Sequence, residues 1–219
     1  MKKNLLILLL GICYCNIDLY DIKWMGIKVA ECSAEVSDTL INENFFIKLD
    51  YKVKSNLFMK FLFNVTNHYT TIIDPTNYNI IFYSKNTTQP NLSNQILKTD
   101  YIDQKVAYPG TNYIINKNEK NIFSLLYLLS AKKISDYDNI ILDREGKKYK
   151  CQINIKNEEY ILNISEKAKG KTGFYENTDI FSWALFLPNT DKKLKINKNK
   201  IEYCKFKKGL ISFTANRVK

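Results

Sequence analysis

The sequence predicts a mainly β fold, in which a strongly curved antiparallel sheet (a half-barrel or open barrel) packs on one principal α-helix. Three observations predict it. Residues 45–53 alternate along a strand, with Phe45, Ile47, Leu49, Tyr51 and Val53 on one face. Turn-forming residues divide the rest of the chain into short segments. One long stretch, NIFSLLYLLSAKK at 121–133, is apolar on nearly every side, so a sheet must cover it.

The N-terminus has the composition of a secretory signal peptide. Lys2 and Lys3 precede an apolar run from Leu5 to Cys13. This run is well short of the roughly 20 residues that a membrane-spanning helix needs. We therefore expect a signal peptide at 1–15, a single β-rich domain at 16–219, and export to the periplasm or association with the outer membrane. The mature chain should have no transmembrane segment and be either soluble or peripheral to the membrane.

The five cysteines leave two questions open. A lipid anchor on Cys13 or Cys15 competes with simple cleavage, which is favoured because Ile12 and Tyr14 are not the small residues that normally precede a lipidated cysteine. Cleavage after Cys15 leaves Cys32, Cys151 and Cys204. We expect these three to be buried thiols, and the alternative is a Cys151–Cys204 disulfide.

The strands are predicted in order along the chain. The first is a hairpin in which 20–24 and 27–29 flank a turn at Met25-Gly26, where glycine supplies the positive φ of a tight turn. After the strand at 45–53 and a short helix at 57–63, further strands are predicted at 61–69, 71–73, 79–83, 104–108, 139–142, 148–155, 159–164, 180–186, 193–196 and 210–214. The polar stretch KNTTQPNLSNQ at 85–95 is predicted to be a mobile loop.

Several segments, taken in order, resemble the bacterial exported family DUF3108, a domain of unknown function. They are YDIKWMGIKVAECSAEV, DYKVKSNLFMKFLFNVTNHYTTIIDPTNYNIIFY, NIFSLLYLLS, REGKKYKCQINIKNEEYI and FKKGLISF, which span nearly the whole predicted mature chain. The resemblance implies an envelope protein with a mainly antiparallel, strongly curved sheet. By looser analogy, such a half-barrel is similar to envelope lipoprotein carriers that hold acyl chains.

The residues give little sign of catalysis. His68 is the only histidine, it lies among polar neighbours, and no nucleophile, phosphate-binding or zinc motif occurs, so we expect no metal, no cofactor and no enzymatic activity. A hydrolase that uses the carboxylate pairs Asp136/Asp138 or Glu158/Glu159 is the remote alternative, because both pairs lie in predicted turns.

Two surfaces are candidate binding sites. A curved sheet around one helix can leave an apolar cleft, for which Trp24, Phe61, Phe63, Tyr127 and Trp183 are the predicted lining. The net charge of +11 favours anionic partners, and Lys192, Lys193, Lys195 and Lys198 are the predicted anionic-surface residues. We expect a non-enzymatic envelope protein that binds a lipid or acyl chain. The alternative is an interaction module that binds another envelope protein or an anionic polymer through its sheet edges and basic face. Nucleic acid is not an expected partner.

Overall fold

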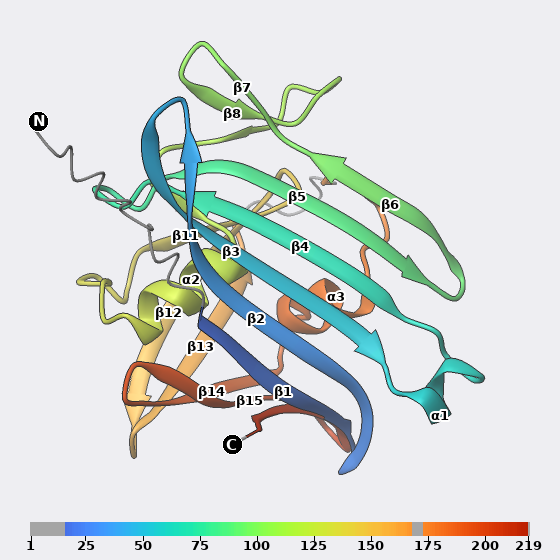
Figure 1. The fold of residues 1–219 in the computed structure, drawn as a ribbon. Helices are drawn as coiled ribbons and strands as arrows, with labels where there is room; N and C mark the ends of the chain where they lie inside the picture. The colour runs from blue at the N-terminus through green and yellow to red at the C-terminus, as the bar shows by residue number, and fades with distance from the viewer. Residues whose placement is uncertain (1–15, 168–172, 219) are drawn as a thin grey trace, which may run out of the picture.

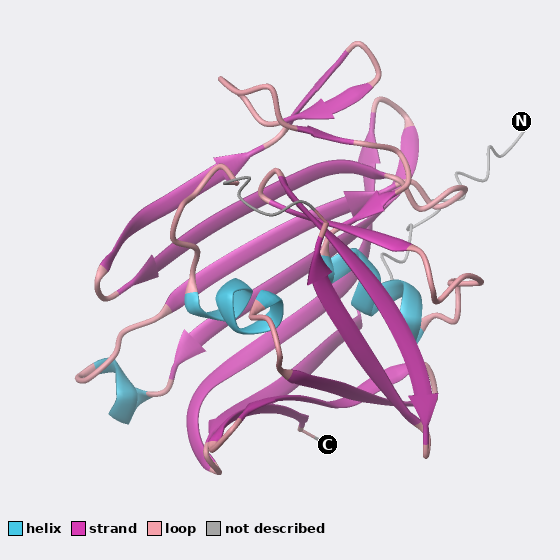
Figure 2. Cartoon of the chain, turned by 180° about the vertical axis from the view of Figure 1, so that it is seen from behind, coloured by secondary structure: helices cyan, strands magenta, loops and turns pink. Residues whose placement is uncertain are grey.

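The computed structural model describes residues 16–167 and 173–218, and most of these residues belong to β-strands (Figures 1 and 2). The strands are β1 (Asn16–Trp24), β2 (Ile27–Ile41), β3 (Asn44–Ser55), β4 (Thr66–Ile73), β5 (Ile80–Gln89), β6 (Leu92–Lys98), β7 (Asp100–Ile102), β8 (Lys105–Ala107), β9 (Ile114–Ile115), β10 (Glu119–Lys120), β11 (Ile140–Arg144), β12 (Lys147–Lys156), β13 (Glu159–Glu166), β14 (Asp191–Asn197), β15 (Lys200–Lys208) and β16 (Ile211–Arg217). The helices are α1 (Leu57–Lys60), α2 (Ile122–Ser130) and α3 (Ile180–Phe186).

Thirteen strands form one sheet in the order β10-β11-β12-β13-β14-β15-β16-β1-β2-β3-β4-β5-β6. Every pair in it is antiparallel except β10 with β11. The last strand, β16, pairs with the first, β1, so the two ends of the domain meet in the middle of the sheet. The sheet curves strongly but does not close, because its order ends at β10 and β6 (Figure 1). A small second sheet contains β7, β8 and β9.

The concave face of the large sheet holds two helices, α2 and α3, rather than the one principal helix that the sequence predicts (Figure 2). Helix α2 begins one residue after Asn121, whose side chain accepts from the Ser124 backbone N–H in a capping box. Nearly all of α2 is buried, and the ring of Phe123 packs against Tyr51, Tyr69 and Phe181. These aromatic contacts join the sheet, α2 and α3 into one core.

Three sequence-based expectations about local structure are confirmed. The hairpin at Met25-Gly26 joins β1 to β2, and both turn residues have positive φ. Helix α1 lies within the predicted 57–63 range. On β3, Leu49 and Val53 are buried as their alternation predicts, whereas Phe45 lies at the end of the β2–β3 hairpin and is 70% exposed.

Two expectations are wrong. The segment 180–186 is helix α3, not a strand; a short apolar run does not distinguish the two by itself, and the buried Asp179 caps this helix by accepting from the Ser182 N–H. The predicted loop at 85–95 is instead a hairpin between β5 and β6. Its inward side chains Lys85, Thr87 and Gln95 are polar yet buried, which a search for apolar alternation cannot detect.

The predicted signal peptide at 1–15, with Cys13 and Cys15, lies outside the described residues. Within the described part of the chain, no helix combines the length and apolarity needed to cross a bilayer.

Candidate functional site: an apolar cavity under the curved sheet

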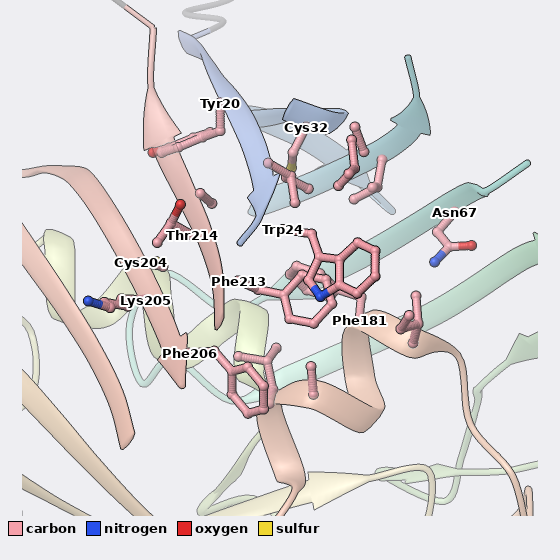
Figure 3. A pocket seen from close by; sticks show the side chains of 18 of the residues that line it. Tyr20, Trp24, Cys32, Asn67, Phe181, Cys204, Lys205, Phe206, Phe213 and Thr214 are labelled. Carbon is pink, nitrogen blue, oxygen red and sulfur yellow. The ribbon is translucent and has the colours of Figure 1, made fainter. Parts of the chain in front are cut away.

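An apolar cavity of about 500 Å³ lies between the concave face of the sheet and the two helices (Figure 3). This volume falls within the roughly 300–1,000 Å³ typical of small-ligand sites. The walls come from β1–β4, β13–β16, the three helices and the segment between α1 and β4. Three lining residues, Trp24, Trp183 and Ile211, are between 43% and 45% exposed, so the cavity reaches the surface beside them.

Small side chains on the strongly curved part of the sheet leave this space unfilled. Ala30 and Cys32 on β2, Cys204 on β15 and Ala215 on β16 all line the cavity. Aromatic side chains then form its rim: Trp24 stacks on Phe213 with ring centroids 6.4 Å apart (Figure 3). The pattern of small residues in the wall and large ones at the opening produces a hollow rather than a packed core.

The lining includes Lys192, Lys193 and Lys205, and Asn67 is the neutral polar side chain of the wall that has an atom without a hydrogen-bond partner (Figure 3). Its side chain is buried, and its orientation is determined by the hydroxyl of Tyr69. That hydroxyl donates its one proton to Asp179 Oδ1 at 2.5 Å, so it accepts from Asn67 Nδ2 at 3.0 Å. Burial and Asp179 raise the pKa of Tyr69 well above its usual value, which keeps this proton in place. Asn67 Oδ1 therefore serves as an acceptor, and it has no hydrogen-bond partner in the described structure.

Two more buried groups extend this polar wall across the sheet. Thr87 on β5 lies opposite Asn67, and Gln95 on β6 lies opposite Thr87. Thr87 Oγ1 and Gln95 Oε1 also lack partners among the described atoms. Because neither residue lines the cavity, a ligand there would meet Asn67 alone of the three.

Two of the three described cysteines line the cavity. Cys32 and Cys204 are free thiols, as is the buried Cys151, so the structure has none of these three in a disulfide. Burial, the largest effect, raises the pKa of each of these thiols to about 12. Cys32 and Cys151 are buried thiols as expected, whereas Cys204 is half-buried, and all three act as small apolar side chains.

The five predicted lining residues divide into two groups. Trp24, Phe63 and Trp183 line the cavity, whereas Phe61 and Tyr127 do not. Phe61 is 93% exposed because it follows the short helix α1, which projects from the body. Tyr127 lies on α2 and packs against the hydrophobic core instead.

Sequence reasoning missed most of the wall. Phe181 was assigned to a strand because α3 was not recognised, and Asn67 and Phe213 were not singled out. The pair Asp179 and Ser182 has the spacing of a helix cap and is the signal that could have revealed α3.

The four predicted anionic-surface lysines do not form one free basic face. Lys192 is only 5% exposed, and its Nζ donates to the Leu187 carbonyl at the end of α3 at 2.9 Å, so its assignment to the surface is wrong. Burial lowers the pKa of Lys192 to about 8. Lys193 pairs with Glu159 at 3.1 Å and Lys195 with Glu158 at 3.6 Å, while Lys198 is an exposed residue of the β14–β15 turn.

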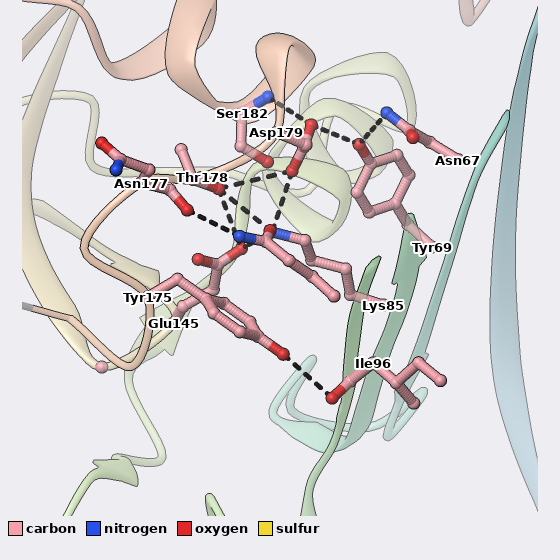
Figure 4. A network of polar contacts seen from close by, with 12 residues as sticks. Asn67, Tyr69, Lys85, Ile96, Glu145, Tyr175, Asn177, Thr178, Asp179 and Ser182 are labelled. Atoms are coloured by element: carbon pink, nitrogen blue, oxygen red, sulfur yellow. Dashed lines mark hydrogen bonds and ion pairs between the residues drawn. The ribbon is translucent and has the colours of Figure 1, made fainter. Parts of the chain in front are cut away.

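A buried ionic cluster holds α3 against the sheet (Figure 4). Lys85 on β5 forms an ion pair with Glu145 in the β11–β12 turn. It forms a second ion pair, 2.9 Å long, with Asp179, the N-cap of α3. All three side chains are at most 2% exposed. Burial raises the pKa of Glu145. Burial also opposes ionisation of Asp179, but Lys85 and the hydrogen bond from Tyr69 outweigh it and lower that pKa.

The segment before α3 is fastened to the sheet by further hydrogen bonds. Gln95 Nε2 donates to the Asn177 carbonyl at 2.6 Å, and the Tyr175 hydroxyl donates to the Ile96 carbonyl at 2.9 Å (Figure 4). The cluster and these bonds position the helix that forms one wall of the cavity.

A second cluster contains Lys148, which pairs with Glu119 and with Asp143 at 2.7 Å. The Tyr108 hydroxyl also donates to Asp143, and burial raises the pKa of this carboxyl. No residue of either ionic cluster lines the cavity. The first cluster is connected to the cavity wall only through Asp179, which is hydrogen-bonded to Tyr69 and through it to Asn67. In the described ranges, no three His, Cys, Asp or Glu side chains are grouped as metal ligands.

The carboxylates considered for hydrolysis lie elsewhere. Asp136 is on the surface and accepts from the Asp138 N–H, which forms a turn. Glu159 is engaged by Lys193 and Tyr203. His68 is 45% exposed and contacts Asp50 at 3.2 Å. Neither these carboxylates nor His68 lines the cavity, whereas Lys193 does.

Comparisons with known proteins bear on the fold alone. No family model matches the sequence, and no curated protein is significantly similar to it. A solved structure, the β-barrel-like protein of the domain of unknown function DUF1849 from Brucella abortus, is similar in fold, with a TM-score of 0.50 and 9% identity. The match covers 93% of this chain and 95% of that one. The fold is therefore mainly β and resembles a β-barrel, while the resemblance to DUF3108 stays a prediction.

Proposed function

We propose that the protein is an exported, non-enzymatic envelope protein that binds a single acyl chain in the cavity under its curved sheet. The observation that carries the proposal is the cavity itself, about 500 Å³ in volume and lined by alternating strand residues and two helices that are almost entirely apolar. An empty cavity of this size lowers the stability of the fold, because the atoms of its apolar walls lack packing partners and lose dispersion contacts.

Asn67 narrows the class of ligand. Its Oδ1 is an acceptor without a partner that is buried in the wall, so a chain whose end group donates a hydrogen bond, such as a hydroxyl or an amide, would pair with it once the side chain turns toward the cavity. A monoacylglycerol-like amphiphile satisfies both features, the apolar chain and the donor.

The two tryptophans of the chain, Trp24 and Trp183, both line the cavity, and this makes their fluorescence a direct reporter. Titration with a dibrominated undecanoyl monoacylglycerol should quench their emission saturably, at one ligand per protein. The unbrominated compound should reverse the quenching by competition. Absence of saturable quenching would remove the basis of the proposal.

Two substitutions on one strand separate cavity binding from surface adsorption. Ala30→Leu adds a side chain to the cavity wall and should weaken binding, whereas Ala34→Leu, on the same face of β2 but outside the lining, should not. Asn67→Leu should weaken binding about fivefold, the value of roughly one hydrogen bond. Thermal melts establish that each variant is folded. Equal binding by the Ala30 and Ala34 variants would place the ligand elsewhere.

A further inference from the structure

Large apolar side chains are exposed together at one end of the sheet, on three neighbouring connections. We call this group the apolar rim. Its members are 43% to 93% exposed and comprise Trp24, Met25, Ile27, Leu57, Phe58, Phe61, Leu62, Leu210 and Ile211. They come from the β1–β2 turn, from α1 with the residues after it, and from the β15–β16 turn.

Hydrogen bonds hold these three connections side by side. The Met25 N–H donates to the Ser212 carbonyl at 2.9 Å, which joins the β1–β2 turn to β16. The side chain of Asn56, the N-cap of α1, donates to the Lys28 carbonyl on β2 at 2.7 Å. The three connections therefore form one continuous surface, and each is short, so its apolar side chains project beyond the sheet.

The apolar rim borders the mouth of the cavity on the side of Trp24 and Ile211. Trp24 and Ile211 belong to both the rim and the cavity lining, and Met59 and Phe63, next to the exposed residues of α1, also line the cavity. At these residues an apolar surface continues from solvent into the interior.

Unpaired positive charge flanks the apolar rim. Lys54, Lys60, Lys207 and Lys208 are exposed, and among the described residues no ion pair involves any of them. Protein-protein interfaces are depleted in lysine, whereas aromatic and aliphatic residues bordered by lysines are typical of surfaces that lie in the headgroup region of a bilayer. Lysines there are attracted by anionic lipids.

We propose that the apolar rim docks the protein on an anionic phospholipid bilayer, with Phe58, Phe61 and Leu210 inserted into the interface and the cavity mouth facing the lipid. This inference goes beyond the proposed function, since adsorption requires only the rim and not an occupied cavity. Docking in this orientation brings the acyl region of the bilayer to the mouth of the cavity.

The test is vesicle flotation of the full chain with two kinds of vesicle, phosphatidylcholine alone and phosphatidylcholine with phosphatidylglycerol. Binding should be stronger to the anionic vesicles and weaker at high salt. The double variant Phe58→Ser/Phe61→Ser should bind at least tenfold more weakly. Changing Lys60, Lys207 and Lys208 to Gln should lower binding to anionic vesicles by roughly fivefold for each lysine.

The matched control is the double variant Leu40→Ser/Phe45→Ser. These residues are 59% and 70% exposed at the β2–β3 hairpin, at the other end of the same strands. All proteins share the same N-terminal segment, so a difference between the two double variants reports the rim. The control should bind like the unsubstituted protein, and equal loss or equal retention in both double variants would overturn the proposal.

Quenching by the brominated monoacylglycerol without vesicles distinguishes this inference from the proposed function. The rim variants should still bind that ligand, because their substituted side chains do not line the cavity. Concentration-dependent dimerisation that Phe58→Ser/Phe61→Ser abolishes, together with no vesicle binding, would assign the rim to a second copy of the chain and refute membrane docking.

Discussion

Replacement of Lys85 by Met tests whether the buried ionic cluster holds α3 in place. Lys85 is fully buried between Glu145 and Asp179, so the substitution leaves two carboxylates buried without their cation. Removal of one partner from a buried ion pair costs about 3–5 kcal/mol. For a domain of this size, the corresponding fall in melting temperature is roughly 6–20 °C.

The pH dependence of this loss follows from the carboxyl pKa values. Burial already raises the pKa of Glu145, and without Lys85 it rises further. An acid whose pKa is higher in the folded than in the unfolded state costs stability as pH rises from the unfolded value, about 4.3, towards the folded one. The destabilisation by Lys85→Met should therefore be largest near pH 8 and shrink towards pH 4.5, by about 1.4 kcal/mol for each unit of further pKa increase.

Urea unfolding followed by circular dichroism at pH 8 and pH 4.5 measures both quantities. Lys98→Met is the control: this exposed lysine lies on the adjacent strand β6, and its loss should change stability by less than about 0.5 kcal/mol. Glu145→Gln in the Lys85→Met background should restore part of the stability. A Lys85→Met variant as stable as the control, or equally destabilised at both pH values, would refute the reasoning.

Three further predictions concern the turns, the buried amine and the thiols. Gly146 has φ +88°, and an added Cβ would lie 2.6 Å from Tyr113 Cγ. Gly146→Ala should therefore lower the free energy of unfolding, measured in urea, by about 2–4 kcal/mol. The loss should exceed that of Gly26→Ala, because Gly26 has the same conformation but open space around it. Because the pKa of Lys192 is lowered to about 8 in the folded state, protonation of this amine favours the unfolded state. The free energy of unfolding should therefore rise by about 3 kcal/mol from pH 8 to 10.5 in the unsubstituted protein relative to Lys192→Met. Parallel pH profiles of the two proteins would contradict this. The pKa values of Cys32 and Cys204 near 12 leave little thiolate at neutral pH. Iodoacetamide should therefore modify these thiols in the folded protein about tenfold faster per pH unit between pH 8 and 11, which mass spectrometry can follow. Rapid modification at pH 8 would refute their burial.

Local patterns in the sequence predicted the elements whose stability is mainly local. The Met25-Gly26 turn, the alternation of β3 and the apolar run capped by Asn121 each contain their own signal, and the corresponding hairpin, strand and helix are present. Trp24, Phe63 and Trp183 line the cavity as predicted, but only Trp24 does so from the sheet: Phe63 follows α1 and Trp183 lies on α3.

Only the tertiary structure decided the remaining features, because they depend on partners distant in the sequence. Segment 180–186 is a helix, and its cap Asp179 is held by Lys85, 94 positions earlier in the chain. The polar residues of 85–95 form strands because Lys85 pairs with the buried Glu145 in the turn after β11, and Gln95 donates to the Asn177 carbonyl in the segment before α3.

The sequence by itself thus determined a mainly β fold with an apolar, aromatic interior. The strongest determinants, residue alternation and turn residues, act within a few positions of the chain. The tertiary structure decided that α3 joins α2 on the concave face, that Lys192 turns inward, and that Ala30, Cys32, Cys204 and Ala215 meet around one hollow. Their spacing in space follows from the pairing of β16 with β1, a contact between the two ends of the domain that no local pattern encodes.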